Sequence, residues 1–187
     1  MGATTTLITF EEFERLPDEP GKCELLEGEV VRMPPAKRKH MKTTERLYLL
    51  LREAVRDLRR RRPELGLGEV HMEMGYRMGS APQSWLQPDV SITHADQSGD
   101  DYYEGAPLVA IEVASDAQSA AHLEAKAQMY LSHGGREVWL VYPKTRHVWI
   151  CRTGKPAVEQ QEIAIRSDVL PGVEIRSDDI FGADLSL

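Results

Sequence analysis

The sequence lacks the features that mark disulfide-stabilised, zinc-binding and membrane-spanning proteins. Its two cysteines, Cys23 and Cys151, lie far apart and form no C-x-x-C motif, which is typical of small buried side chains in a reducing compartment. The histidines include no pair at the three-to-five spacing that puts two zinc ligands on one helix face. No apolar run approaches the ~20 residues that cross a bilayer.

The N-terminus also lacks the basic and apolar segments of a secretory signal. Residues 1–6 match the loose pattern for N-myristoylation, which is short and common and predicts little by itself. We therefore expect a cytoplasmic protein. With 187 residues, 41% hydrophobic and 28% charged, the chain suits a single globular domain over residues 1–187.

Positive charge is scarce overall but concentrated in one segment. The net charge is −7, yet the segment from Ala36 to Arg62 holds 11 Lys and Arg against three acids. A local basic stripe can bind phosphates whatever the total charge. The alternative, equally supported, is a solvated helix whose C-terminal arginines interact favourably with the helix dipole. The candidate nucleic-acid contacts are Lys37, Arg38, Lys39, Lys42 and Arg46.

Periodicity and turn signals predict an α/β fold with a mixed sheet. Thr9 and Glu12 form a capping box, and Glu27-Gly28 joins two strands into an N-terminal hairpin. An apolar period of 3.6 predicts a long helix over 38–61, and period-two alternation predicts one strand over 70–78. The other expected elements are a loop over 80–87, strands near Asp89 and over 108–114, 138–142 and 147–152, a helix over 119–133, and β-like C-terminal pieces with a short helix from about Ser177.

One acid interrupts a strand that is otherwise apolar. The run from Leu108 to Ala114 contains no charged residue except Glu112. Burying an unpaired carboxylate costs several kcal/mol or forces it to take a proton. Asp89, 23 positions earlier, lies in another short β-like run. If the two strands are neighbours, the two carboxylates together cost more, unless a cation lies between them. The pair therefore indicates a hard metal ion.

The residues around Glu112 leave space for such an ion. Alternation puts Glu112 on the same strand face as Ala110 and Ala114, whose side chains are small. Mg²⁺ takes oxygen ligands at ~2.0–2.1 Å and usually keeps several waters. The predicted ligands are Asp89, Glu112 and the backbone carbonyl of Val113. A metal-bound water has a lowered pKa and becomes a usable nucleophile toward phosphorus.

Lys126 is the predicted cation of this site. It borders the apolar face of the helix expected over 119–133, so its ammonium can reach the strand ends and support the attacking water. Simpler interpretations stay open. Glu112 and Lys126 could form a buried ion pair without a metal, or Lys126 could be a surface lysine. Asp89 could be a turn acid after proline.

These residues resemble the PD-(D/E)XK nuclease superfamily, in which an Asp and a later Glu-x-Lys build a magnesium site for phosphodiester cleavage. A closer resemblance, over nearly the whole chain in order, is to a bacterial family of restriction-endonuclease-like proteins. The matching motifs are Glu24-Leu25-Leu26-Glu27-Gly28-Glu29, His40 at the start of the long helix, Pro88-Asp89-Val90, Glu112-Val113-Ala114-Ser115, Lys126 with Tyr130, Gly134 or Gly135, Glu137-Val138-Trp139, and Leu170-Pro171-Gly172.

The sequence departs from this pattern beside the site. Ala114 stands where the superfamily has a lysine two residues after the glutamate. The resemblance is to a branch in which that lysine lies on the next helix, which makes Lys126 the substitute. His122 stands where the family often has Asp, and Asp116 where it usually has Pro.

The resemblance implies a restriction-endonuclease-like α/β core, with a mixed central sheet flanked by helices, an N-terminal hairpin and C-terminal β additions. It also implies a metal-dependent endonuclease that hydrolyses nucleic acid, DNA rather than RNA, with Mg²⁺ or Mn²⁺ as cofactor. The catalytic residues would then be Asp89, Glu112 and Lys126. The alternative from a different class is an inactive nucleic-acid-binding or scaffold protein that retains the fold.

Three further residues are auxiliary candidates under this resemblance. Glu24 or Glu27 could add a ligand or orient a metal-bound water, although hairpin acids usually lie at the surface. His40 could act beside them, although a histidine at a helix start is more often a surface residue. Exposed strand edges and the apolar hairpin over 138–150 indicate a homodimer.

Overall fold

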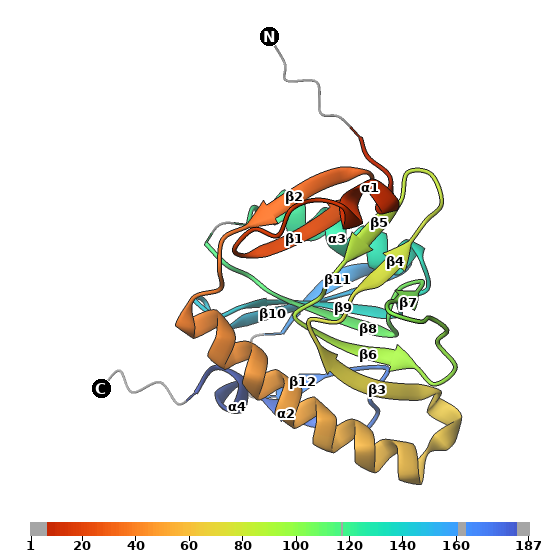
Figure 1. The fold of residues 1–187 in the computed structure, drawn as a ribbon. Helices are drawn as coiled ribbons and strands as arrows, with labels where there is room; N and C mark the ends of the chain where they lie inside the picture. Colours follow the sequence, from red (N-terminus) through yellow and green to blue (C-terminus); the bar gives the residue numbers. More distant parts are fainter. Residues whose placement is uncertain (1–6, 117, 161–163, 183–187) are drawn as a thin grey trace.

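A six-stranded mixed sheet forms the centre of the computed structural model, which describes residues 7–116, 118–160 and 164–182 (Figure 1). Residues 1–6, with the myristoylation pattern, lie outside this part. Strands β8 and β9 are parallel, and the other neighbouring strands are antiparallel, so the sheet is mixed as predicted. The strand order is β11 (Lys155–Gln160), β10 (His147–Arg152), β9 (Glu137–Tyr142), β8 (Val109–Val113), β6 (Val90–His94) and β3 (Leu67–Met72).

A smaller sheet contains the N-terminal hairpin and packs beside the first. The short helix α1 (Phe10–Glu14) lies on this sheet, with the Phe13 ring 5.5 Å from that of Trp85. The strand order is β2 (Glu29–Met33), β1 (Lys22–Leu26), β5 (Ser84–Leu86), β4 (Tyr76–Met78) and β7 (Tyr103–Glu104). The remaining elements are η1 (Pro63–Leu65), β12 (Ala164–Arg166), β13 (Glu174–Arg176) and α4 (Ser177–Phe181).

The central sheet separates two hydrophobic cores. Helix α2 (Arg38–Arg61) covers one face, and α3 (Ala120–Ser132) with the smaller sheet covers the other (Figure 1). Side chains of β8 alternate between these cores: Ile111 and Val113 belong to the α2 side, and Ala110 belongs to the α3 side. Glu112 therefore points toward α3, as alternation predicts.

Most of the expected elements are confirmed to within a residue or two. The hairpin and α2 have the predicted bounds, and Thr9 and Glu12 form both hydrogen bonds of the capping box. Ser119 caps the N-terminus of α3 by accepting a hydrogen bond from the backbone N–H of His122. This cap fixes the start of the helix that contributes Lys126.

The prediction of a single strand over 70–78 is wrong. This segment contains the end of β3 and all of β4, which lie in different sheets. The chain leaves the central sheet at Glu73, which has a φ of 49°, and at Gly75, where a Cβ would lie 2.6 Å from the Trp85 side chain. In the sequence, apolar residues alternate from Val70 to Met78 without interruption, so the pattern does not reveal the break between the two strands.

The expected loop over 80–87 contains β5, which pairs with both β1 and β4. All three residues of β5 are buried, and a strand buried on both faces shows no alternation. This strand joins the N-terminal hairpin to the rest of the smaller sheet. It also brings β1 toward the segment that precedes Asp89.

The apolar hairpin of β9 and β10, which indicated a homodimer, lies inside the core of one chain. Val138, Trp139, Val148 and Ile150 are all fully buried there. These side chains need no partner, so the prediction of a homodimer loses this support. In the part of the chain that the structure describes, no helix is long and apolar enough to span a membrane.

Two leucines of α2 test how strongly this helix is held against the sheet. Leu51 is fully buried, whereas Leu49 on the same helix is 54% exposed. We expect Leu51→Ala to lower the free energy of unfolding by about 2–5 kcal/mol, because it removes methyl groups and leaves a cavity. Leu49→Ala should change it by less than about 0.5 kcal/mol. Equal effects in urea unfolding would contradict this packing.

Candidate metal and active site

Asp89 and Glu112 come from neighbouring strands and are both buried. Strands β6 and β8 pair with Val90 opposite Ile111, and this register places Asp89 beside the end of β8. The backbone N–H of Val113 donates a 2.7 Å hydrogen bond to Asp89 Oδ2. Asp89 is 3% exposed and Glu112 is 1% exposed. The structure thus brings the two acids together, as expected from sequence.

Helix α3 supplies the groups that hold Glu112. Lys126 Nζ lies 2.7 Å from Glu112 Oε1, and the Tyr130 hydroxyl donates a 2.8 Å hydrogen bond to the same oxygen. The ion pair considered as an alternative is therefore present. It uses only one carboxylate oxygen, because Glu112 Oε2 is buried and has no hydrogen-bond partner among the described residues.

Glu24 is a full member of this buried cluster. It is 0% exposed, on β1, and Lys126 Nζ lies 2.9 Å from both of its carboxylate oxygens. The backbone N–H of Gln87 donates a further 2.9 Å hydrogen bond to Glu24 Oε1. Lys126 therefore joins two carboxylates that come from different sheets.

Lys22 is the site residue that sequence reasoning missed. Its Nζ lies 3.1 Å from Asp89 Oδ1 and 3.8 Å from Glu24 Oε1. The missed signal is the Lys-x-Glu spacing: Lys22 and Glu24 are two residues apart on one strand, so their side chains share a face. Had Glu24 been predicted to be buried at the site, this spacing would have predicted that Lys22 lies there too.

His40 completes the cluster from the first turn of α2. Its Nε2 lies 3.2 Å from Asp89 Oδ2, and its side chain is 12% exposed. Helix α2 thus contributes a site residue at its N-terminal end, in addition to its packing face. His40 therefore lies at the acids, and its auxiliary role stays a prediction.

The two central acids have opposite pKa shifts. Burial alone would raise the pKa of Asp89, but the charge of Lys22 and the contact with His40 hold this pKa well below its usual range. Burial raises the pKa of Glu112, and Lys126 and Lys22 offset this rise only in part. Acids with divergent pKa values in one cluster are typical of functional sites.

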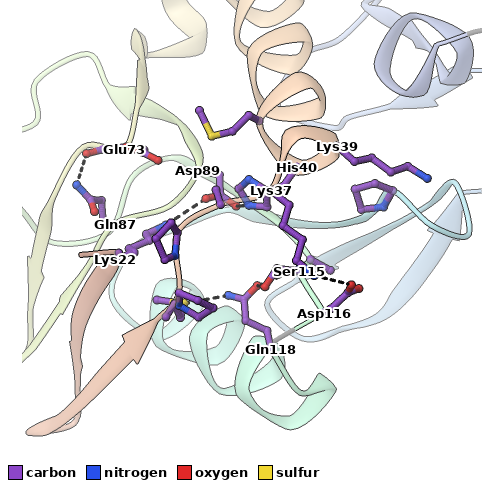
Figure 2. Close-up of a pocket in the computed structure, with 18 of the residues that line it drawn as sticks. Lys22, Lys37, Lys39, His40, Glu73, Gln87, Asp89, Ser115, Asp116 and Gln118 are labelled. Atoms are coloured by element: carbon purple, nitrogen blue, oxygen red, sulfur yellow. Dashed lines mark hydrogen bonds and ion pairs between the residues drawn. The ribbon is translucent and has the colours of Figure 1, made fainter. Parts of the chain in front are cut away.

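A pocket of about 740 Å³ opens onto this cluster (Figure 2). Figure 2 shows Lys22 joined to Asp89, with His40 beside them, and Lys37 joined to Asp116 elsewhere on the pocket wall. Lys126 and Glu112 are not among the lining residues and lie deeper. The basic lining residues are Lys22, Lys37, Lys39, His40 and Lys144.

Not all of the predicted residues reach this pocket. Glu27 is exposed on the turn between β1 and β2, where its backbone N–H bonds to Ser84 Oγ. Arg46 Nη1 donates to the carbonyl of Ile180 in α4. Arg38 and Lys42 are exposed on α2 but do not line the pocket. Of the predicted nucleic-acid contacts, only Lys37 and Lys39 line it.

The donor set fits a hard cation with few protein ligands. Among the described residues, no group of three or more His, Cys, Asp and Glu has the geometry of a metal site. Two carboxylate oxygens nevertheless remain for a cation, namely the unpartnered Glu112 Oε2 and Asp89 Oδ1, which contacts Lys22. Mg²⁺ is commonly held by one or two carboxylates while keeping several waters. The Val113 carbonyl stays a predicted ligand.

The chain resembles known proteins both in sequence and in fold. A family model described as "Uma2: Putative restriction endonuclease" matches residues 10–183. The chain belongs to this family. It is also similar to a solved structure described as "a putative nuclease belonging to DUF820 from Anabaena variabilis ATCC 29413". That match has a TM-score of 0.78 and 20% identity, over 93% of this chain and 97% of that chain. No curated protein matches.

The family and the restriction-endonuclease-like fold are thus the ones that the motifs indicated. The structural match shows a shared fold. In this Uma2 family member, Ala114 leaves the position two residues after Glu112 without a lysine, and Lys126 contacts Glu112 from α3 instead. The geometry is therefore consistent with Lys126 as the substitute lysine.

The pH dependence of stability tests the contact between His40 and Asp89. Burial alone would lower the pKa of His40, but its contact with Asp89 raises it overall. A raised pKa stabilises the fold below the unfolded value of about 6.5, and this stabilisation disappears as pH rises through the folded pKa. In EDTA, the melting temperature of wild type minus that of His40→Gln should therefore be largest in mildly acidic solution and fall as pH rises above about 6.5.

His71 provides a control of opposite sign. Burial lowers its pKa, so the neutral form is favoured in the folded state. The difference between wild type and His71→Gln should therefore rise with pH in mildly acidic solution. A His40 difference that is flat or rises with pH would contradict the contact.

Proposed function

We propose that this Uma2 family member is an endonuclease that uses Mg²⁺ or Mn²⁺ to hydrolyse phosphodiester bonds, in DNA rather than RNA. The observation that supports it most is the pair of buried acids on adjacent segments of the central sheet. Glu112 Oε2 has no hydrogen-bond partner among the described residues, and Asp89 Oδ1 contacts the Lys22 ammonium. The preference for DNA rests on the family description, restriction endonuclease. When bound, a divalent ion supplies Lewis-acid activation of water and neutralises phosphate charge.

The side chains have separate roles in this proposal. Asp89 and Glu112 would hold the ion, Glu112 through its unpartnered Oε2 and Asp89 through Oδ1, which contacts Lys22. Lys126 and Tyr130 fix Glu112 Oε1, so that Oε2 keeps one orientation. Lys126 also neutralises charge beside Glu24. Pre-positioned charge of this kind supplies a large part of the catalysis in many enzymes.

Removing each central group should stop or strongly slow cleavage, and Lys126→Met should also lower stability, because it leaves Glu24 and Glu112 buried without their cation. We expect Asp89→Asn, Glu112→Gln and Lys126→Met to lower the rate of plasmid nicking in Mg²⁺ or Mn²⁺ by roughly 10²–10³-fold. Glu53→Gln is the matched control, because Glu53 is 74% exposed on α2 and pairs only with Arg56 in the described part of the chain. Circular dichroism of each variant verifies folding.

The proposal fails if nicking survives all three changes within ~10-fold. A wild type that neither cleaves nor gains stability from millimolar Mg²⁺ or Mn²⁺ would instead indicate a scaffold that retains the fold, because an ion that binds only the native state raises the melting temperature. Parallel assays on single-stranded RNA and single-stranded DNA of one sequence test the preference for DNA.

The basic stripe of α2 divides into two parts with different expected roles. At its C-terminal end, Arg56, Arg60 and Arg61 pair with acids of the same helix. At its N-terminal end, Lys37 and Lys39 line the pocket. The first part matches the solvated-helix interpretation, and the second supports the phosphate-binding one.

Binding of a DNA duplex in EDTA tests this division. The double variant Lys37→Gln/Lys39→Gln should weaken binding and reduce the slope of log K against log salt by about one for each phosphate that the protein no longer neutralises. The control pair Arg60→Gln/Arg61→Gln removes the same charge from the other end of α2 and should change the slope less. Fluorescence anisotropy at several salt concentrations measures both. Equal changes would mean that the whole helix binds phosphate.

A further inference from the structure

The pocket-facing side of the acid cluster contains an ammonium where a metal ion would need to bind. Lys22 Nζ lies 3.1 Å from Asp89 Oδ1, one of the two oxygens left for a cation. The other oxygen of Asp89 already accepts from the backbone of Val113 and contacts His40. An ion bound by Asp89 from the pocket side therefore meets Lys22 first.

The charge of the cluster does not allow both cations. Glu24, Asp89 and Glu112 bring three negative charges, and Lys22 with Lys126 brings two positive ones. Replacing one ammonium by a divalent ion makes these charges balance, even with His40 neutral. Adding the ion beside both ammoniums leaves a net positive charge in a buried site, which is unfavourable.

Only one of the two lysines has a route out. Lys126 is 0% exposed and is held by Glu24 and Glu112 at 2.7–2.9 Å. The Lys22 side chain is 17% exposed and lines the pocket. Its flexible four-carbon stem can turn into the pocket without moving β1. The pocket also contains Lys37 and Lys39, so the displaced ammonium stays among groups that can neutralise phosphate.

We propose that the Lys22 ammonium takes the place of a divalent cation in the metal-free protein, and that metal binding at Asp89 and Glu112 displaces it into the pocket. This inference rests on the proposed metal-dependent function and adds a competitor for the metal within the chain. Lys22 then lowers the affinity for the ion and keeps the acids paired while the ion is absent. Burial would lower the pKa of Lys22, but Asp89, Glu24 and Glu112 raise it, which agrees with an ammonium that is charged in place.

Metal titrations of Lys22 variants test the exchange without an activity assay. Mn²⁺ binding is measured by calorimetry for wild type, Lys22→Met and Lys22→Arg, with Lys144→Met as the control. Lys144 also lines the pocket, but it pairs with Asp116, which is not part of the acid cluster. Lys22→Met should bind Mn²⁺ at least ~10-fold more tightly than wild type, because the competing charge is gone. Lys22→Arg and Lys144→Met should stay within about threefold of wild type.

Thermal unfolding and amine labelling provide independent measurements. Without metal, Lys22→Met should melt below wild type, because three acids then share one ammonium, and Mn²⁺ should raise its melting temperature more than it raises that of wild type. In wild type, Mn²⁺ should speed the reductive methylation of Lys22 several-fold, as followed by mass spectrometry, while leaving that of Lys144 unchanged.

The outcomes separate this inference from the proposed function. If wild type binds Mn²⁺ and Lys22→Met binds it no more tightly, the exchange is wrong and the metal site stands. If Mn²⁺ binds neither protein at millimolar concentration, the proposed function is wrong, and the exchange with it. Unchanged labelling of Lys22 in the Mn²⁺-bound wild type would also overturn the exchange.

Discussion

The buried contact of Lys126 with two glutamates joins the parts of this fold that make the site. Glu112 lies on the central sheet, Glu24 on the smaller sheet and Lys126 on α3. Each charge alone would be costly at 0–1% exposure. Because the three are buried together, the positions of both sheets relative to α3 are tied to one ammonium. Tyr130 reinforces the contact from the next turn of the same helix.

This constraint also explains why the site has an inner and an outer side. On the inner side, Lys126 uses the oxygens of Glu24 and one oxygen of Glu112. On the outer side, Lys22 and His40 approach Asp89 from β1 and α2. The inner contacts are fully buried and hold the fold together. The outer contacts, which are made to Asp89, border the pocket and can change when a ligand enters, whereas the inner contacts of Glu24 and Glu112 stay in place.

The sequence was sufficient to predict the two central acids, Asp89 and Glu112, but not Lys22, the cation that pairs with Asp89. Glu112 is visible because a charge in an apolar strand is an energetic anomaly, whatever the fold. Lys22 has no such signal: it stands in a short hairpin that looks exposed, and its partner Asp89 is 67 residues away. The boundary between β3 and β4 was missed because alternation continues across it, although the two strands belong to different sheets. Contacts between distant segments decide both cases, and local periodicity does not contain them.

The departures from the family pattern leave the charge balance of the cluster intact. His122 stands one turn before Lys126, where the resemblance led us to expect an acid, and burial together with the charge of Lys126 lowers the pKa of this histidine. A neutral side chain there leaves the ammonium to Glu24 and Glu112, whereas an acid would compete for it. Asp116 lies at the pocket wall, 48% exposed, and pairs with Lys37 and Lys144 instead of with the cluster. Both changes therefore affect the surroundings of the site. A cation that binds there still meets the same three buried acids and the same two lysines, Lys22 and Lys126.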